Sequence, residues 1–231
     1  MTAKAYRIKL CWGLEKGECP NLLDPDPGLK QDLESVLESS GWPQCLRGSL
    51  QRDIKPLDQF SVSVSGCPNG CSRPQIADFG LLQAQHPQVI VERCTGCGEC
   101  QDACREGAID LETDVARINP KDCLSCGRCI RACPEQALKP VQQGYRIQMG
   151  GKLGRHPRLA EELPGIQSRD QMLQIIDRCL ELHVAHYRPG VRFGQVVAGM
   201  NTRSVLDPKA NAEIQASWLR TPRITYSGPD S

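Results

Sequence analysis

Cysteine is the residue that most constrains this chain, because 14 cysteines fall within 231 residues and eight of them form two matching runs. Each run has the spacing C-x2-C-x2-C-x3-C. Two-residue gaps let successive thiolates turn towards one iron–sulfur cluster on a tight loop, while the fourth cysteine of each run points at the other cluster. The spacing therefore predicts two 4Fe-4S clusters, one held by Cys94, Cys97, Cys100 and Cys133 and the other by Cys123, Cys126, Cys129 and Cys104.

A pair of zinc sites is the alternative interpretation of these runs, because structural zinc sites also use C-x2-C pairs. Zinc needs four ligands but does not require one regular spacing to occur twice. Iron–sulfur ligation follows this spacing as a rule, so the runs favour clusters over zinc.

Composition excludes several classes of function. Lys and Arg total 28 against 27 Asp and Glu, so the net charge is +1 and nucleic acid is not an expected partner. No apolar run of roughly 18 residues is present, so no membrane span is predicted. Residues 1–7 lead into no apolar signal segment, which predicts a cytoplasmic protein with reduced thiols rather than disulfides.

Residues 89–140 resemble the bacterial two-cluster ferredoxins. The resemblance includes an internal repeat, since residues 94–109 are similar to residues 123–138. Arg105 stands where the first run would normally carry a proline, but no ligand is lost by this difference. The resemblance implies an inserted ferredoxin domain with two 4Fe-4S clusters.

A second motif covers residues 66–73 (Gly-Cys-Pro-Asn-Gly-Cys-Ser-Arg), directly after a pattern of alternating apolar residues over 60–64 that is typical of a strand. It resembles part of the cluster motif of the siroheme-dependent sulfite and nitrite reductases, in which a C-x5-C pair and a C-x3-C pair hold a 4Fe-4S cluster. This resemblance implies that Cys71 also bridges the cluster to the siroheme iron. It also implies that Asn69 and Arg73 lie near siroheme.

Two more segments resemble the same family in the same order, namely the strand over 76–82 and the Gly-Gly-x-x-Gly strand and loop over 144–158. A ferredoxin between these strands is the arrangement of dissimilatory sulfite reductase subunits and of the anaerobic sulfite reductase C subunit. The chain is thus identified as similar to this family over about residues 8–200. The basic side chains of the loop fit either siroheme carboxylates and an anionic substrate or a solvated surface: Lys152, Arg155 and Arg158.

The first cysteine pair of the third cluster is assigned to Cys11 and Cys19, although seven residues separate them where the family usually has five. Cys11 ends a short alternating strand pattern, and the residues after Cys19 resemble the family's continuation. Cys45 is the rival, but it has no partner at cluster spacing. The predicted ligands of the third 4Fe-4S cluster are therefore Cys11, Cys19, Cys67 and Cys71, while Cys45 and Cys179 are expected to be small buried residues.

Two helices are predicted beside these motifs. The first carries an apolar stripe over 29–37, with Asp26 as its N-cap and Pro27 at its first position. The second covers 168–187 and begins with a capping box of Ser168 and Gln171. On this second helix, His183 and His186 are expected to be packed or solvated rather than metal ligands.

The expected fold is α+β, a mixed sheet with flanking helices that forms a siroheme and 4Fe-4S reductase-type half and carries the inserted ferredoxin domain. The expected boundaries are residues 1–88 and 141–204 for the two segments of the reductase-like domain, 89–140 for the insert, and 205–231 for a C-terminal tail.

The resemblance implies an oxidoreductase subunit that passes electrons through two ferredoxin clusters to a siroheme-coupled third cluster and reduces sulfite or nitrite. Family members carry a half-domain ahead of the first cysteine pair that supplies much of the siroheme pocket and its anion clamp, whereas ten residues precede Cys11 here. A partner subunit or a second copy is expected to complete the pocket, and a separate protein or redox subunit to donate electrons. No catalytic residue is assigned.

The alternative is a siroheme-free electron-transfer subunit of a larger redox complex, which the C-x7-C spacing favours. The intact motif over 66–73 favours the reductase. A standalone ferredoxin leaves the matches outside the insert unexplained.

Overall fold

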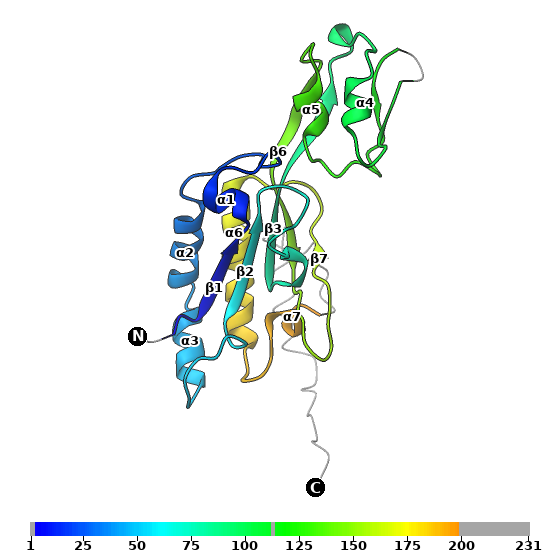
Figure 1. Ribbon diagram of the computed structural model, residues 1–231. Helices are drawn as coiled ribbons and strands as arrows, with labels where there is room; N and C mark the ends of the chain where they lie inside the picture. Colours follow the sequence, from blue (N-terminus) through cyan, green and yellow to red (C-terminus); the bar gives the residue numbers. More distant parts are fainter. Residues whose placement is uncertain (1–2, 112–113, 199–231) are drawn as a thin grey trace.

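The chain is built around a mixed five-stranded sheet in a computed structural model that describes residues 3–111 and 114–198. The sheet order is β1-β2-β3-β6-β7, with β1, β2 and β3 parallel, β6 antiparallel to β3 and β7 antiparallel to β6. The strands are β1 (Tyr6–Leu10), β2 (Phe60–Ser65), β3 (Phe79–Val89), β6 (Leu138–Met149) and β7 (Glu161–Glu162). The predicted α+β class with a mixed sheet is confirmed (Figure 1).

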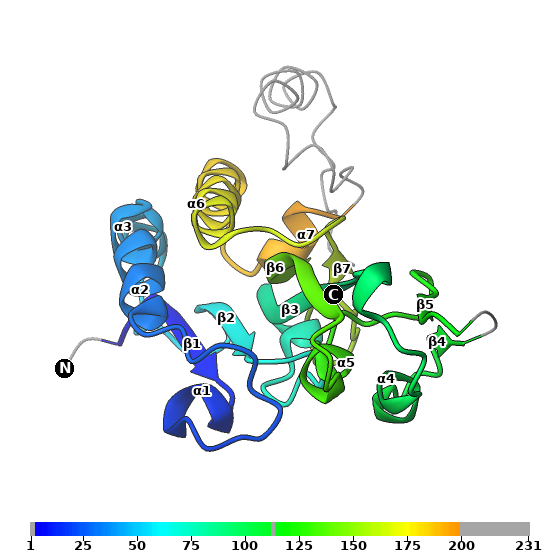
Figure 2. The same ribbon diagram turned by 90° about the horizontal axis from the view of Figure 1, so that it is seen from above.

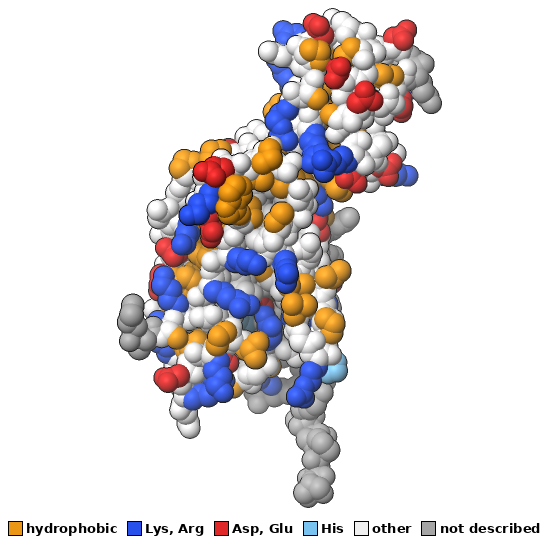
Figure 3. All heavy atoms as spheres, viewed as in Figure 1, with side chains coloured by type: hydrophobic (Ala, Val, Ile, Leu, Met, Phe, Trp, Pro, Cys, Tyr) orange, Lys and Arg blue, Asp and Glu red, His pale blue; other side chains and the backbone are white. Residues whose placement is uncertain are grey.

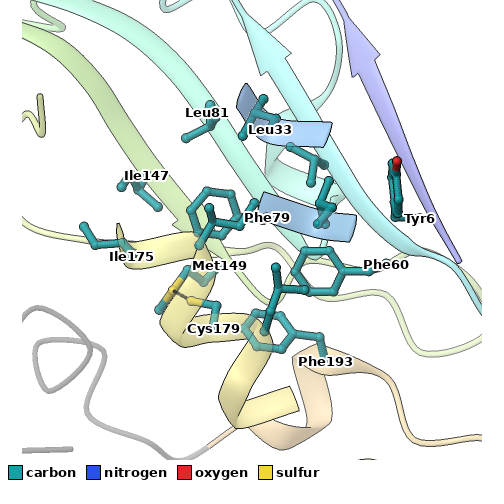
Figure 4. Packing of buried hydrophobic residues seen from close by; sticks show 14 of the residues in the cluster. Tyr6, Leu33, Phe60, Phe79, Leu81, Ile147, Met149, Ile175, Cys179 and Phe193 are labelled. Atoms are coloured by element: carbon teal, nitrogen blue, oxygen red, sulfur yellow. Dashed lines mark hydrogen bonds between the residues drawn. The ribbon is translucent and has the colours of Figure 1, made fainter. Parts of the chain in front are cut away.

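One face of this sheet is covered by helices of the described residues, as Figures 1 and 2 show. They are α2 (Leu29–Ser39), α3 (Trp42–Ser49), α6 (Arg169–His186) and α7 (Phe193–Val196). The alternation of β2 explains the packing, because its apolar residues turn to the helices and its serines turn to the opposite face. Figure 4 shows the resulting core, with Phe60, Phe79 and Met149 facing Cys179 and Phe193. Each large side chain buried in this way contributes roughly 1.5–3 kcal/mol to stability.

Of the two predicted helix N-caps, the one at α6 is confirmed and the one at α2 is wrong. Ser168 caps α6 through a complete capping box with Gln171, as predicted. The prediction for the first helix is wrong, because the N-cap residue of α2 is Gly28 and not Asp26. The Asp26 carboxylate instead accepts hydrogen bonds from the Tyr145 hydroxyl and the Arg169 guanidinium. These partners come from distant parts of the chain and hold Asp26 outside the helix.

Residues 90–137 form a separate unit above the sheet (Figure 1). β3 and β6 stay paired from Phe79–Met149 to Val89–Leu138 and so form a two-stranded neck below this unit. Its elements are the 3-10 turn η2 (Val91–Arg93), α4 (Glu99–Ala103), β4 (Ile109–Asp110), β5 (Arg117–Ile118) and α5 (Arg128–Ala132). It has its own apolar cluster, which includes Cys100, Ile109, Ala116, Cys129 and Leu138.

The internal repeat of the sequence reappears in this unit. α4 and α5 each begin after a left-handed glycine, contain the third cysteine of a run and end before the fourth. The unit lies between the two strands where the insert was predicted, and its identity as a ferredoxin domain stays a prediction, as do the domain boundaries. The predicted tail over 205–231 lies outside the described residues.

His183 lies in the core, which confirms that its side chain is packed. Its ring contacts Trp42, Phe60, Tyr187 and Phe193 at centroid distances of 4.3–5.8 Å, and it is 3% exposed. Burial lowers the pKa of His183 to about 4.

We predict that His183 makes the fold less stable in mild acid. The folded pKa lies below the unfolded value of 6.5, so its full contribution is present above about pH 6.5 and is lost as the pH falls towards 4. Between pH 7.5 and 5 the loss should be about 2 kcal/mol of unfolding free energy. Urea unfolding of wild type and His183→Phe at both pH values measures this loss. An equal decrease in the free energy of unfolding of the two proteins between pH 7.5 and 5 would contradict the prediction.

Gly80 brings a second chain segment close to β3. A Cβ at this position would lie 2.4 Å from the backbone oxygen of Pro74, which belongs to the 3-10 turn η1 (Pro74–Ile76). Gly80→Ala should lower the unfolding free energy by about 1–3 kcal/mol, because backbone must move to make room. Urea unfolding provides the measurement. Gly48→Ala is the control, since nothing lies within 4 Å of that Cβ and a helical alanine should stabilise by up to about 1 kcal/mol.

Candidate iron–sulfur centres and the open face of the sheet

The ends of β1 and β2 bring two cysteines side by side. Cys11 directly follows β1, and Cys67 follows β2 after Gly66. Both strands leave the sheet at the same edge, because Leu10 pairs with Val64 in parallel register. The Gly66 amide donates a hydrogen bond to the Cys11 sulfur at 3.3 Å. An amide N–H directed at sulfur stabilises thiolate charge and is one of the contacts that tune cluster ligands.

Cys19 returns to this edge through the turn after α1 (Trp12–Lys16). A Cβ on Gly13 would lie 2.7 Å from the Cys19 Cβ, so Cys19 packs directly against α1. The Leu23 amide donates to the Gly66 carbonyl at 3.0 Å and ties the same loop to the edge. Burial raises the pKa of Cys67, and the neighbouring thiols of Cys71, Cys19 and Cys11 raise it further. The four cysteines predicted for the third cluster thus lie near one edge of the sheet, and their role as ligands of one cluster stays a prediction.

Cys45 and Cys179 lie apart from these four. Cys179 is completely buried on α6, and its thiol donates to the Met149 sulfur at 3.3 Å. Burial raises the pKa of Cys179. Cys45 lies on α3, partly buried against the main core. Both positions fit the predicted role of small apolar residues.

The turn after β2 separates the environments of its two cysteines. Cys67 is buried and Cys71 is exposed. The turn is held by the Ser72 amide, which donates to the Ser65 hydroxyl at 3.2 Å, and it ends at Arg73 in a left-handed conformation with φ 66°. Cys71 is therefore the most exposed of the four residues, whereas Cys67 is buried and Cys11 and Cys19 are partly buried.

A basic hollow lies beside this turn, on the face of the sheet opposite α2, α3, α6 and α7, where η1 also packs. Its rim carries Arg7 and Lys9 from β1 and Arg73 from the turn, and its floor includes Ser61 and Ser63 of β2. Figure 3 shows Lys and Arg side chains gathered on this face. Sequence reasoning missed Arg7 and Lys9, although their alternation with the apolar residues of β1 was a usable signal. Guanidinium and ammonium groups in this arrangement can bind carboxylates or oxyanions.

The basic loop after β6 is largely occupied with its own fold. Lys152 and Arg158 exchange two backbone hydrogen bonds of 2.8 and 2.9 Å. The Arg158 guanidinium donates to the Gly150 carbonyl at 3.0 and 3.2 Å. The Arg158 side chain therefore holds this turn in shape.

The remaining predicted cofactor contacts occupy different places. Asn69 is exposed on the Cys67 turn, close in sequence to Arg73. Arg155 lines another hollow beside Phe60, at the start of β2 and not at its cysteine end. The structure therefore does not gather the predicted cofactor residues into one hollow, and a siroheme contact for each stays a prediction.

The first cluster site of the insert has a cavity of its own. The cavity is lined by the four cysteines assigned to it: Cys94, Cys97, Cys100 and Cys133. Amides of Ala116 and Ala137 donate to the sulfurs of Cys94 and Cys133 at 3.4 and 3.2 Å. Burial raises the pKa of Cys100, and the thiols of Cys94 and Cys133 contribute to that rise. The fourth cysteine of the second run thus lies with the first run, as the spacing predicts.

The second site shows the same pattern in part. Burial raises the pKa of Cys129 to about 12, with further contributions from the thiols of Cys123 and Cys126. Amides donate to the sulfurs of Cys123 at 3.4 Å and Cys104 at 3.3 Å. The membership of Cys104 in this site rests on the repeat alone and stays a prediction.

The residues present fit iron–sulfur clusters on two observations. Thiolate is the ligand that such clusters require, and amide N–H groups point at four of the sulfurs in the insert. Within residues 3–111 and 114–198, no three His, Cys, Asp or Glu side chains are arranged to hold a single metal ion. No helix in the described part of the chain is long and apolar enough to cross a membrane.

A mixed sheet with cysteine-rich loops at one end is the architecture expected of an iron–sulfur protein. Comparison with protein families identifies the family, because the model of the nitrite and sulphite reductase 4Fe-4S domain matches residues 51–207. The match covers more than half of the chain, and the chain therefore belongs to this family. The resemblance found in the sequence is confirmed.

Two relatives have names that describe sulfite reductases. The coenzyme F420-dependent sulfite reductase of Methanocaldococcus jannaschii is 40% identical over 129 residues, which is 54% of this chain and 20% of the relative. The anaerobic sulfite reductase C subunit of Salmonella typhimurium is 37% identical over 46 residues, which is 20% of this chain and 14% of the relative. The chain thus spans a fifth or less of these relatives.

One solved structure supports the fold. The crystal structure of dissimilatory sulfite reductase I superposes with a TM-score of 0.57 at 18% identity, covering 91% of this chain and 53% of that chain. At this identity the likeness concerns the fold.

We predict that Cys19 is a cluster ligand and Cys45 is not. Cys19→Ala should lower the iron content by about four atoms per chain, the content of one 4Fe-4S cluster. Cys45→Ala should leave it unchanged, because Cys45 lies on α3 away from the four thiols. Anaerobic purification and iron determination measure both variants. If Cys45→Ala loses this iron and Cys19→Ala keeps it, the fourth ligand of the third cluster is Cys45 and not Cys19.

Proposed function

We propose that this chain is an iron–sulfur subunit of a sulfite- or nitrite-reducing enzyme. In this proposal, electrons pass through two clusters of the ferredoxin-like insert to a third 4Fe-4S cluster coupled to siroheme, where the anion is reduced. The observation that carries the proposal is the exposed Cys71 beside the basic hollow of Arg7, Lys9 and Arg73. An exposed cysteine and an adjacent cationic face suit a second, carboxylate-bearing group.

Siroheme and the clusters would supply the multi-electron chemistry when bound. The contribution of the chain is positional. Cys11, Cys19, Cys67 and Cys71 would hold the third cluster, and the Gly66 amide would stabilise the Cys11 thiolate. Arg7, Lys9 and Arg73 would bind acidic groups of siroheme or the inorganic anion. Asn69, Lys152, Arg155 and Arg158 remain candidates for further contacts.

A partner subunit or a second copy of the chain is proposed to cover the open face. The basic hollow lies on the side of the sheet opposite α2, α3, α6 and α7, and one relative is named as a subunit. The second proposed partner is an electron-donor protein or redox subunit that supplies the insert. The cytoplasm is the proposed location.

The alternative function is electron transfer without siroheme. The loop from Cys11 to Cys19 favours it, since it is two residues longer than the family spacing and contains the helix α1. In this alternative the three clusters remain, and Cys71 is only a cluster ligand.

The deciding experiment is an anaerobic visible spectrum combined with tetrapyrrole extraction and iron determination. About thirteen irons per chain with a siroheme spectrum are expected, from three 4Fe-4S clusters and one haem iron. About twelve irons without tetrapyrrole would replace the reductase with the electron-transfer alternative. About eight irons would contradict the third cluster itself.

A further inference from the structure

The two cysteine loops of the insert differ in their contacts with the rest of the protein. Residues 123–129 are bonded to β3, to β6 and to the loop that carries Cys19. Among the described residues, no hydrogen bond or ion pair joins residues 94–100 to the sheet or to residues 11–28. In Figures 1 and 2, α5 lies beside the body of the protein and α4 lies farther out.

Backbone contacts fix the inner loop on β3. The Gln85 amide donates to the Ser125 carbonyl at 2.7 Å, and Gln85 forms an isolated parallel bridge with Cys126. The His86 ring and the Ser125 hydroxyl lie 3.1 Å apart, and the Arg146 guanidinium donates to the Leu124 carbonyl at 3.3 Å. The loop is therefore held along its length and not at one point.

Gly127 allows this loop to lie close to the Cys19 loop. A Cβ at Gly127 would lie 2.7 Å from the Gln85 side-chain oxygen and 3.3 Å from a methyl group of Leu23. The backbone of Gly127 is also left-handed, with φ 65°. Leu23 is four residues after Cys19, so the second cysteine run and the third-cluster loop pack directly on each other.

One side-chain bond joins the two loops. The Arg128 guanidinium donates to the Asn21 amide oxygen at 2.9 Å. Arg128 directly precedes Cys129, and Asn21 is two residues after Cys19. The bond therefore links residues adjacent to ligands of two different proposed clusters.

We propose that the second run holds the inner cluster of the insert, and that Arg128 and Asn21 are positioning residues that set its approach to the third cluster. The proposal rests on the ligand sets of the proposed function. Electrons then enter at the Cys94–Cys100 side and leave beside Cys19. Each transfer moves one electron, so that one site is oxidised as the next is reduced, and the reductant is the electron-donor protein.

The positioning role is tested by hydrogen–deuterium exchange on Arg128→Gln, Asn21→Ala and the double variant. Either single change should speed exchange of the amides at 19–24 by about three- to ten-fold, the loss expected for one hydrogen bond of ordinary net strength. The double variant should show no further increase, because both changes remove the same bond. Arg131→Gln is the matched control, an exposed arginine on the same helix. Unchanged exchange in Arg128→Gln, or additive effects in the double variant, would overturn the positioning role.

The order of the clusters is tested by electron paramagnetic resonance of the dithionite-reduced protein. Magnetic coupling falls steeply with distance, so Cys126→Ala should remove the coupling felt by the third cluster, whereas Cys97→Ala should leave it. The reverse result would overturn the order. If either cysteine variant fails to fold, the same signal in Arg128→Gln decides, since the coupling should weaken there and stay at the wild-type value in Arg131→Gln.

These outcomes separate the inference from the proposed function. Loss of the siroheme assignment alone leaves three clusters whose order can still be measured. Fewer than about twelve irons in the wild type would overturn the ligand sets, and therefore the proposed function, while the exchange experiment still tests the contact between the loops.

Discussion

The parallel pairing of β1 with β2 is the constraint on which the candidate site depends. With Leu10 opposite Val64, both strands end at one edge. The Cys11 sulfur therefore accepts a hydrogen bond from the amide of Gly66, the residue before Cys67, although the two positions are 55 apart in the sequence. A shift of one residue would turn the apolar side of β1 to solvent. The burial that fixes the sheet register therefore also fixes the positions of the sulfurs. The helices on the covered face contribute to the site in this indirect way.

The second structural constraint is the long ladder between β3 and β6. The insert leaves the sheet on two strands that remain paired up to Val89 and Leu138, with one irregularity between His86 and Pro87. A paired ribbon holds direction better than a flexible linker, because both strands share the ladder of hydrogen bonds. The contacts of residues 123–129 with this ribbon then determine which side of the insert faces the body.

The features that could be predicted from the sequence are those set by local spacing. The two cysteine runs, the strand patterns of β1 and β2 and the capping box of α6 each lie within a short window, and the structure follows them. Features that depend on long-range partners were missed. Asp26 is a residue type that often caps helices, yet its carboxylate accepts hydrogen bonds from Tyr145 and Arg169 instead. No local sequence pattern predicts these two partners, because both are more than 100 residues away from Asp26 in the chain.

The same distinction applies to the basic residues of the site. Arg155 and Arg158 are predicted cofactor contacts because they lie in a matched motif. In the structure, Arg158 donates to the Gly150 carbonyl and Arg155 lines another hollow. Arg7 and Lys9 lie far from Arg73 in sequence and meet it only because β1 and β2 are neighbours. Spatial grouping of charge across strands follows from the topology, which single-sequence patterns do not specify.

The floor and the rim of the basic hollow have different roles. Its floor is made of small β2 serines whose hydroxyls are already bonded inside the protein, Ser61 to Asp78 at 2.6 Å and Ser63 to the Ser72 carbonyl at 2.8 Å. A floor that is buried and satisfied has little capacity to select a polar ligand. The rim retains positive groups in a cluster, and their mutual repulsion is relieved when an anionic group enters. The small serine side chains leave room in the hollow, and the positive charge of its rim favours an anionic occupant.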